Sequence, residues 1–395
     1  MTRAETVRVD LADRGYDILV GAGMMAELGD AVRARFGMRR AFIVTDERVA
    51  KHWLEPARQA LSAAGCQTEQ IVLPNGEATK SFAQLERLLD RLLGAQIGRD
   101  GVVVALGGGV VGDLAGFAAA ITLRGLDYVQ VPTTLLSQVD SAVGGKTAIN
   151  TRHGKNLVGS FHQPGLVVID TAVLDTLPPR EVLAGYGEVV KYGLICDSVF
   201  FDWLEVNGTK VLAGDPEARR IAVVESCRAK ANIVAADERE TGDRALLNFG
   251  HTFGHSLEAE AGFNGRLLHG EAVSIGMILA LELSHLMNLC PGQDVDRVRR
   301  HFARVGLPMD IASIAGSNGW NALALIDHMR HDKKVLQGRM RFVLARCVGE
   351  AFVTAEVEED VVARVLKESL AATPNFIAPP VKISGVAAGT TGGGS

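Results

Sequence analysis

The sequence predicts an α/β N-terminal domain with a mostly parallel sheet, followed by a mainly α-helical C-terminal domain. Over residues 1–180, short runs of valine and isoleucine alternate with amphipathic stretches of helical period, as in strands joined by helices. After Leu177-Pro178-Pro179, long helical periods dominate. We therefore expect two domains, 1–180 and 181–373. The remaining segment, 374–395, loses the helical pattern and ends in Gly, Thr and Ser, so it is expected to be a disordered tail.

Each expected element follows from its own pattern. The run 101–106 is apolar at almost every position, which is typical of a parallel strand buried on both faces. A hairpin near the N-terminus is expected to add antiparallel strands at one sheet edge. In chain order, we expect strands at 6–10 and 16–20 (the hairpin), 39–45, 68–73, 101–106, 127–131 and 166–170; helices at 47–64, 81–95, 110–123, 180–194, 216–238, 270–289 and 294–305; and a late hairpin of 340–346 and 351–355.

Composition indicates an ordinary globular protein and argues against several function classes. The 395 residues are 47% hydrophobic and 22% charged, and the net charge of −5 points neither to nucleic acid nor to a membrane surface. The apolar stretch 101–123 contains six glycines and Asp113, so we do not expect it to span a membrane. The N-terminus lacks the apolar segment of a signal peptide. Five scattered cysteines without Cys-x-x-Cys spacing indicate a reduced, cytoplasmic setting.

A glycine-rich turn follows the apolar run 101–106. In Gly107-Gly108-Gly109-Val110-Val111-Gly112-Asp113, glycines between a strand and a helix allow the backbone to approach a pyrophosphate. The spacing differs from the Rossmann fingerprint, and a purely structural turn remains an alternative. Earlier in the chain, Asp46 directly follows the strand expected at 39–45. This carboxylate suits ribose hydroxyls, although it equally suits the N-cap of the next helix.

Further along the chain, hydroxyl and amino groups offer more possible contacts for a phosphorylated ligand. Thr133 and Thr134 follow the strand expected at 127–131. Residues 140–147 superficially resemble a P-loop, but Asp140 stands where that motif has its first glycine, so a nucleotide-triphosphate kinase is discounted. Lys146 and Lys155 each follow a glycine and suit phosphate contacts from flexible loops. A solvated surface position is the alternative for either lysine.

Glu188, His251 and His269 form a candidate set of metal ligands. Two imidazoles and one carboxylate bind zinc and leave a fourth position open, as a catalytic metal requires. His251 and His255 are spaced i, i+4 and share one helix face, and Glu188 and Lys191, spaced i, i+3, share another. No glutamate stands where zinc proteases place their base, so peptide hydrolysis is disfavoured. For His255, a hydrogen-bonded or core position is the alternative.

Several cationic side chains lie in short motifs that contain glycine or asparagine. They are Lys146, Lys155, Lys191, Lys230 and Arg244. A metal beside this much positive charge suggests a small anionic substrate with a hydroxyl or carbonyl group for the metal to polarise. Lys333 and Lys334 suit either a solvated turn or a further anion contact.

Together these motifs resemble 3-dehydroquinate synthase, of the sugar-phosphate cyclase superfamily. They occur in that enzyme's order, spread over residues 40–345, and leave the tail outside. The motifs that carry the resemblance are 75–80 (Asn-Gly-Glu-Ala-Thr-Lys), 107–113, 131–136, 140–146, 154–156, 187–191, 248–255 and 269–271.

The resemblance implies the second step of the shikimate pathway, in aromatic amino acid biosynthesis. The substrate would be 3-deoxy-D-arabino-heptulosonate 7-phosphate, and the products would be 3-dehydroquinate and inorganic phosphate, so the enzyme would be a carbon–oxygen lyase. It implies a tightly held NAD that oxidises the substrate before phosphate elimination and is regenerated after it, when NADH returns its hydride. An intramolecular aldol closure would complete the turnover. The metal would be zinc or cobalt.

The resemblance also assigns roles to residues. Glu188, His251 and His269 would bind the metal. The arginine matching Arg124 reaches a neighbouring subunit's site in the family, which implies a homodimer. Residues that would contact NAD are Asp46, Asn75, Gly76, Glu77, Lys80, Gly108, Gly109, Val110, Val111, Gly112, Asp113, Thr133, Thr134, Leu136, Lys146, Lys155, Leu174 and Thr176. Residues that would contact substrate are Arg124, Asp140, Lys146, Asn156, Lys191, Lys230, Arg244, Asn248 and His255, with Lys333 or Lys334.

Three alternatives compete with this interpretation. Another sugar-phosphate cyclase, making a valiolone or a deoxy-inosose, would act on a substrate without the carboxylate that Lys230, Arg244 and Asn248 suit. A metal-dependent polyol dehydrogenase would release NADH and leave the lysines unexplained. A non-catalytic NAD-binding paralogue is expected to lose some metal or phosphate residues, and the matched positions retain them.

Overall fold

The computed structural model describes residues 4–240, 242–262, 265–331 and 340–373. Two predictions lie outside the described residues: the disorder of 374–395, and the contact of Lys333 or Lys334 with substrate. Within the described residues, no helix has the length and hydropathy that a membrane span needs.

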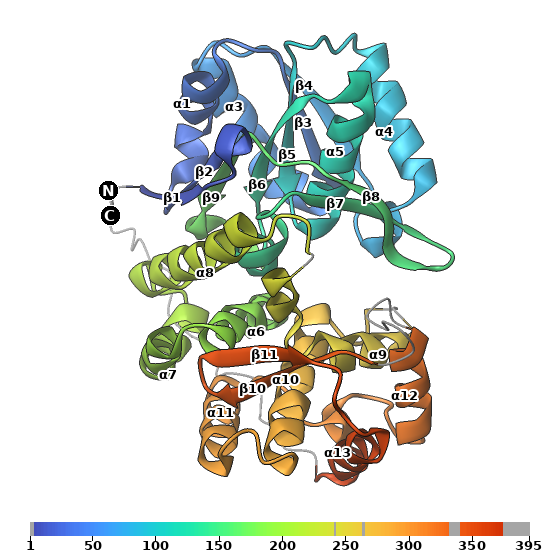
Figure 1. Cartoon of the computed structure of the whole chain (residues 1–395). Helices are drawn as coiled ribbons and strands as arrows, with labels where there is room; N and C mark the ends of the chain where they lie inside the picture. Colours follow the sequence, from blue (N-terminus) through green and yellow to red (C-terminus); the bar gives the residue numbers. More distant parts are fainter. Residues whose placement is uncertain (1–3, 241, 263–264, 332–339, 374–395) are drawn as a thin grey trace, which may run out of the picture.

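The N-terminal half is built on a seven-stranded sheet with the order β1-β2-β9-β6-β5-β3-β4 (Figure 1). Only β1 is antiparallel to its neighbour, so the prediction of a mostly parallel sheet with a hairpin at one edge is confirmed. The strands are β1 (Glu5–Val9), β2 (Tyr16–Gly21), β3 (Ala41–Asp46), β4 (Thr68–Leu73), β5 (Val102–Gly107), β6 (Asp127–Pro132) and β9 (Leu166–Asp170).

Helices cover both faces of this sheet. Val103 and Ala105 of β5 pack with α4 (Phe82–Gly94) and α5 (Gly109–Ile121), whereas Val104 and Leu106 pack with α1 (Met24–Phe36) and α3 (Glu55–Ala63). Successive side chains of a strand point to opposite faces, which explains why the whole of β5 is apolar. Between β3 and α3 lie α2 (Glu47–Val49) and the π-helical turn η2 (Ala50–Leu54), so one helical stretch is continuous as predicted.

The segment after β6 differs from its prediction. Lys146 and Lys155 do not lie on flexible loops, because β7 (Lys146–Thr151) and β8 (Gly154–Phe161) pair as an antiparallel hairpin. β7 packs on α5, where a Cβ at Gly116 would lie only 2.5 Å from Thr147. The glycines before Lys146 and Lys155 suggested loops, but Thr147, Ala148 and Ile149 are buried in succession, as in a strand that neighbouring elements cover.

The second half is mainly helical. The four helices predicted here correspond to α6, α8, α10 and α11, and the late hairpin corresponds to β10 (Phe342–Cys347) and β11 (Glu350–Thr354). Among the described residues, α7, α12 and α13 were not predicted, and α9 was expected only from the i, i+4 spacing of its two histidines. The helices are α6 (Pro179–Ile195), α7 (Ser198–Ala213), α8 (Pro216–Ala236), α9 (His251–Ala261), α10 (His269–Leu286), α11 (Gly292–Val305), α12 (Ala322–His331) and α13 (Glu359–Ala371).

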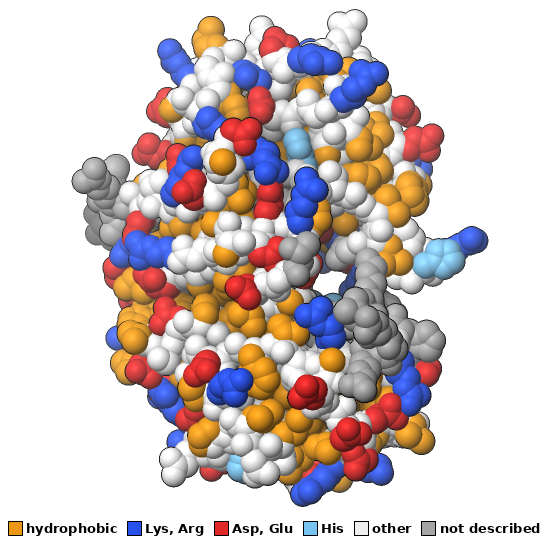
Figure 2. Space-filling model, in the orientation of Figure 1, with side chains coloured by type: hydrophobic (Ala, Val, Ile, Leu, Met, Phe, Trp, Pro, Cys, Tyr) orange, Lys and Arg blue, Asp and Glu red, His pale blue; other side chains and the backbone are white. Residues whose placement is uncertain are grey.

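The two halves share a continuous apolar core. Val7 and Ile18 of the edge strands belong to the same buried cluster as Val223 and Val224 of α8, and α8 lies along β1 in Figure 1. The π-helical turn η5 (Ser137–Ser141), which follows β6, packs against both α6 and α8. The segment that follows the carboxyl end of β6 is therefore in direct contact with the helical half. Figure 2 shows the surface hollowed between the two halves, with basic side chains at its edge.

Candidate active site

Glycines allow α6 and α10 to meet backbone to backbone. A Cβ at Gly270 would lie 1.9 Å from the carbonyl oxygen of Ala184, and a Cβ at Gly187 would lie 2.6 Å from Ser274 Oγ. Glu188 lies on α6, and His269 is the first residue of α10. This contact places a carboxylate and an imidazole from distant parts of the chain beside one another.

A second close contact brings in His251. α9 begins at His251, directly after Gly250, whose φ of +79° suits glycine. A Cβ at Gly276 of α10 would lie 2.0 Å from the carbonyl oxygen of Gly250. The start of α9 is therefore fixed against the middle of α10, and the three predicted ligands come together.

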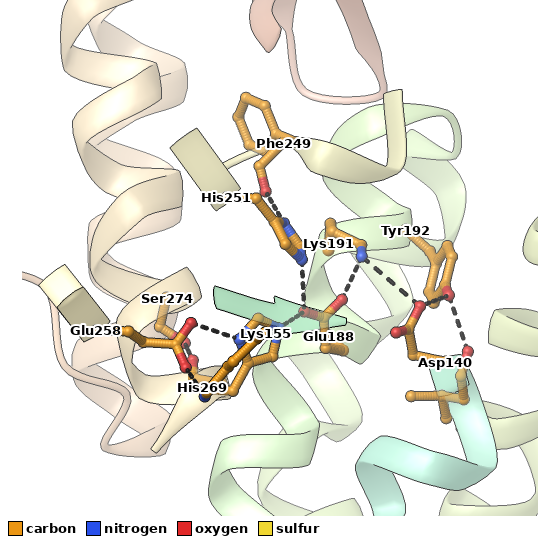
Figure 3. Close-up of polar contacts among 12 residues, drawn as sticks. Asp140, Lys155, Glu188, Lys191, Tyr192, Phe249, His251, Glu258, His269 and Ser274 are labelled. Carbon is orange, nitrogen blue, oxygen red and sulfur yellow. Dashed lines mark hydrogen bonds and ion pairs between the residues drawn. The ribbon is translucent and has the colours of Figure 1, made fainter. Parts of the chain in front are cut away.

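The three predicted ligands have the geometry of a metal site. The Nε2 atoms of His251 and His269 lie 3.6 and 3.8 Å from Glu188 Oε1 (Figure 3). A tetrahedral zinc site separates its nitrogen and oxygen ligands by about 3.3 Å. The Nδ1 of His251 faces the carbonyl oxygen of Phe249 at 3.2 Å, and the Nδ1 of His269 faces Glu258 Oε2 at 3.0 Å. These acceptors favour the proton on Nδ1 and leave each Nε2 as an electron-pair donor.

Glu188 gives a separate reason to expect a cation here. Its side chain is 0% exposed, and its Oε1 has no hydrogen-bond partner. The Lys191 ammonium forms an ion pair with the other oxygen, Oε2. A buried carboxylate with unmade hydrogen bonds is costly, and a divalent ion shared with the two histidines would remove that cost. The residues therefore fit a metal with an open coordination position.

Two lysines flank this site through Asp140 of η5. Lys230 Nζ, from α8, donates to Asp140 Oδ1 at 2.7 Å, and Lys191 Nζ lies 4.0 Å from the same oxygen. Burial opposes ionisation of Asp140, but both lysines outweigh it and hold the pKa of its carboxyl below the usual range. Burial lowers the pKa of Lys230. Glu188 and Asp140 overcome burial and raise the pKa of Lys191.

A second polar group lies where η7 (Asp243–Asn248) meets the β7–β8 hairpin. Lys146 Nζ forms a 2.5 Å ion pair with Glu240, and Asn248 Nδ2 donates to the same carboxylate at 3.1 Å. Arg244 is 1% exposed, and its Nη2 donates to the carbonyl oxygen of Gly144 at 2.9 Å. The Nε of Arg244 is buried without a partner, so it remains available to an anion.

The glycine-rich turn forms a narrow cradle at the carboxyl edge of the sheet. A Cβ at Gly108 would lie 3.1 Å from Thr134 Cγ2, and one at Gly109 would lie 3.1 Å from Ser141 Oγ. Thr133 Oγ1, at the end of neighbouring β6, is buried without a hydrogen-bond partner. The N-terminus of α5 points its free N–H groups into this region, which fits a pyrophosphate.

A hydrogen-bond network joins this cradle to the hairpin. Lys80 Nζ donates to Asp113 Oδ2 at 2.6 Å and to Asn156 Oδ1 at 2.5 Å. Asn150 Nδ2 donates to Glu77 Oε1 at 2.7 Å, and Asn150 Oδ1 accepts from the N–H of Asn156 at 3.0 Å. The 75–80 motif, α5 and β8 are thus connected, although they are separate in the sequence.

The remaining predicted residues differ in where they lie relative to the glycine cradle. Asp46 caps α2 by accepting from the N–H groups of Arg48 and Val49. Leu174, in η6 (Thr171–Thr176), is buried in the core, which leaves only its backbone for a cofactor. Arg124 is exposed at the far end of α5, about 20 Å from the glycine cradle for a helix of this length. Asn75 and Gly76 precede η3 (Glu77–Thr79), Val110 to Gly112 lie in the first turn of α5, and Leu136 precedes η5.

The structure adds three residues that the sequence analysis did not select. Glu240 pairs with Lys146, Asn150 joins Glu77 to Asn156, and Glu258 accepts from His269. Only Glu258 carried a usable signal. It lies three residues after His255 and seven after His251, so it shares their face of α9.

Comparison with known proteins identifies the family. The model of the 3-dehydroquinate synthase N-terminal domain matches residues 70–184, and that of the C-terminal domain matches residues 185–335. The chain belongs to the 3-dehydroquinate synthase family. A 3-dehydroquinate synthase of Rhodospirillum rubrum is 55% identical over 93% of this chain and 96% of its own length. That of Ruegeria pomeroyi is 53% identical over 93% and 99%.

Solved structures of two cyclases share the fold of this 3-dehydroquinate synthase family member. A 2-deoxy-scyllo-inosose synthase, complexed with carbaglucose-6-phosphate, NAD⁺ and Co²⁺, has a TM-score of 0.84 with 26% identity over 93% of this chain and 100% of its own. The 2-epi-5-epi-valiolone synthase of Streptomyces hygroscopicus, with NAD⁺ and Zn²⁺ bound, has a TM-score of 0.81 with 27% identity over 92% and 98%. A glycerol dehydrogenase of Schizosaccharomyces pombe, 18% identical over 89% of this chain and 88% of its own, shows the fold alone, with a TM-score of 0.65.

Proposed function

We propose that the chain converts 3-deoxy-D-arabino-heptulosonate 7-phosphate into 3-dehydroquinate and inorganic phosphate, with NAD and zinc or cobalt. The observation that carries this proposal is an open set of metal ligands beside buried cations, next to a glycine-lined cradle. A substrate with adjacent hydroxyls, a carboxylate and a phosphate has a partner here for each group. The reaction makes the protein a carbon–oxygen lyase.

We assign the metal to Glu188, His251 and His269, and the pyrophosphate of NAD to the cradle at Gly108 and Gly109. When bound, NAD supplies a reversible hydride acceptor and the metal polarises a substrate oxygen. The support for this assignment is the buried Oε1 of Glu188, which has no hydrogen-bond partner, and the tight contacts that a Cβ would make at the two glycines.

The substrate's anionic groups are assigned to the cations around the site. Lys146 and Asn156 hold the phosphate, together with Arg124 from a neighbouring subunit. Lys230 and Arg244, with Asn248, hold the carboxylate. The partnerless Nε of Arg244 supports this assignment, and so does the Glu240 carboxylate, because it occupies an anion-binding position between Lys146 and Asn248.

His255 is assigned a proton relay between the substrate's hydroxyl and phosphate regions. Its ring is edge-on to that of His251, with centroids 5.4 Å apart, and its centroid lies 6.0 Å from that of His269. It is therefore adjacent to the metal ligands without belonging to their set. Imidazole is a common general acid and base in enzymes, which suits this role.

Assembly, location and domain organisation complete the proposal. We assign the protein to the cytoplasm as a homodimer, with domains 1–180 and 181–373. All five cysteines are free, as suits a reducing compartment. The exposed position of Arg124, far from the cradle of its own chain, suits a contact with a second subunit.

The test is phosphate release from 3-deoxy-D-arabino-heptulosonate 7-phosphate, with NAD and zinc added and the absorbance of NADH followed. Equal amounts of phosphate and dehydroquinate, with no accumulation of NADH, are expected. Net NADH without phosphate would contradict the proposal and indicate a polyol dehydrogenase.

A second substrate tests the nearest rival function. The solved cyclases that share the fold make a deoxy-inosose and a valiolone, so sedoheptulose 7-phosphate is offered in a parallel assay. We expect no turnover, because Lys230 and Arg244 would then face no carboxylate. Turnover of this sugar in preference to the heptulosonate would overturn the assignment of the two cations.

A further inference from the structure

Glu258 touches the metal site and the opposite half of the molecule at once. The residue lies on α9 and is 5% exposed. Its Oε2 accepts from His269 Nδ1 at 3.0 Å, and its Oε1 accepts from Lys155 Nζ at 3.1 Å. Lys155 belongs to β8 of the N-terminal half, so one carboxylate joins a metal ligand to the hairpin (Figure 3).

The two histidine ligands are oriented by different kinds of partner. His251 Nδ1 faces the backbone carbonyl oxygen of Phe249, only two residues away, so this acceptor belongs to its own segment. His269 Nδ1 instead faces a side chain on another helix. That side chain can take several rotamers, and the ion pair with Lys155 selects one of them. The orientation of His269 therefore depends on a contact between the two halves.

We propose that Glu258 is a positioning residue, which fixes His269 for the metal and couples metal binding to the docking of the β7–β8 hairpin. Hydrogen bonds behind a ligating histidine fix its orientation and raise its basicity. The hairpin also carries Lys155 and Asn156, so its docking affects NAD and substrate. Metal and NAD then each increase the other's affinity by the same factor. This inference rests on the proposed metal and NAD sites and is independent of the substrate.

An alternative use of the same side chains is a second metal position. His255, Glu258 and His269 offer atoms within 4.8 Å of one another. Both oxygens of Glu258 already accept hydrogen bonds, and His269 can donate from Nδ1 only while that nitrogen carries a proton. These contacts favour a support for one metal over a site for two.

The experiment measures zinc affinity by competition with a chromophoric chelator, using full-length protein freed of metal. Glu258→Ala is expected to weaken zinc binding roughly 10- to 100-fold, the range for losing such a partner. Glu258→Gln keeps an oxygen that can accept from His269 but loses the charge that holds Lys155. We therefore expect its zinc affinity to lie between those of Glu258→Ala and the wild type. The matched control is Glu260→Ala, on the same helix, whose carboxylate instead pairs with His328 at 2.9 Å. It is expected to bind zinc like the wild type.

A second readout tests the coupling itself. We expect zinc to tighten NAD binding to the wild-type protein by about 5-fold or more, and this effect to disappear in Glu258→Ala and in Lys155→Met. Thermal unfolding of the metal-free variants identifies any that fail to fold, and cobalt spectra of the folded ones report ligand geometry. An intact coupling in Lys155→Met would overturn the link to the hairpin.

The outcomes separate the possible failures. A wild-type protein that binds no zinc would remove the proposed metal site and this inference with it. Wild-type binding of one zinc, with equal affinity in Glu258→Ala, would overturn only the role of Glu258. Two zinc ions per wild-type chain, falling to one in Glu258→Ala, would show that the carboxylate is itself a ligand.

Discussion

At the scale of single residues, the site is defined by polar atoms whose partners are missing or unusually placed. Glu188 is the clearest case, because its Oε1 is buried without a hydrogen bond while two histidines lie near it and Lys191 pairs with its other oxygen. Most buried polar atoms in proteins are paired, so such an atom indicates a missing ligand. The same argument applies to Arg244 Nε and Thr133 Oγ1.

The metal set predicts a strong effect of a nearly isosteric change. Glu188→Gln keeps the shape of the side chain but removes the charge that binds a divalent ion. We expect zinc content to fall below one per chain and activity to drop by more than about 100-fold, beyond the loss typical of outer partners. Metal analysis of purified protein, with the phosphate-release assay, checks this. Full activity with a full zinc content would contradict the ligand assignment.

A buried histidine outside the site predicts a pH dependence of stability. His301 is 2% exposed, and its ring nitrogens face Tyr186 Oη at 3.1 Å and Arg304 at 3.4 Å. Burial, with Arg304 and Arg297 opposing the nearby Glu205, lowers the pKa of His301 to about 4 from 6.5. Between these values the unfolded chain binds the proton more readily, so the free energy of unfolding falls as the pH is lowered.

The size of this effect is bounded by one proton. Each pH unit inside the window costs at most about 1.4 kcal/mol. Urea unfolding at pH 7 and pH 5 measures it, and His301→Gln is expected to reduce the difference, since the amide cannot titrate. An unchanged difference in this variant would assign the pH dependence to other groups.

At the scale of elements, the active site depends on helices that touch through glycine. The contact between α6 and α10 excludes a Cβ at Gly270, where it would lie 1.9 Å from the carbonyl oxygen of Ala184. Since α6 carries Glu188 and α10 starts with His269, the distance between two metal ligands is set by this contact. Stability and metal geometry therefore depend on the same glycine.

Gly270→Ala is expected to weaken both properties. Forcing a methyl group into this contact costs about 1–3 kcal/mol of unfolding free energy and moves His269 away from Glu188. Chemical denaturation and zinc affinity measure the two effects. The control is Gly94→Ala, at the end of α4, where an added Cβ meets nothing within 4 Å. It is expected to be neutral or to stabilise by up to about 1 kcal/mol, because alanine favours a helix.

At the scale of the whole molecule, ion pairs span the two halves around the site. Lys230 of the helical half meets Asp140, Lys155 of the hairpin meets Glu258, and Lys146 of the hairpin meets Glu240. Glu240 adopts a left-handed φ of +60°, which is uncommon for glutamate. An anionic substrate has to compete with Glu240 for Lys146, so this carboxylate opposes anion binding in the free protein.

Glu240→Gln is therefore expected to bind inorganic phosphate more tightly than the wild type. The Lys146 side chain is 48% exposed, so solvent limits the gain to roughly 2- to 5-fold. Calorimetric titration with phosphate at low and high salt measures it, and the gain is expected to shrink as salt screens the charges. Glu225→Gln, on the surface of α8, is the control of equal charge change. Equal phosphate affinity in Glu240→Gln and the wild type would show that Glu240 does not compete with phosphate for Lys146.

The sequence by itself determined the features that local patterns encode. Apolar runs such as 101–106 became buried parallel strands, and the spacing of His251 and His255 placed both on one face of α9, because strand and helix periods act over a few residues. The family motifs followed from the same local information. The hairpin at Lys146 to Phe161 was missed, because its glycines suggest a loop until packing against α5 stabilises the strands.

Only the tertiary structure decided which of these residues act together. No sequence period relates Lys155 to Glu258, Asn150 to Glu77 or Glu240 to Lys146, since each pair joins elements that are distant along the chain. Their contacts depend on how the glycine-packed helices and the sheet meet, and on which charges remain unpaired when they do. The sequence therefore determines the chemistry that each side chain can perform, whereas long-range packing determines which partner it meets.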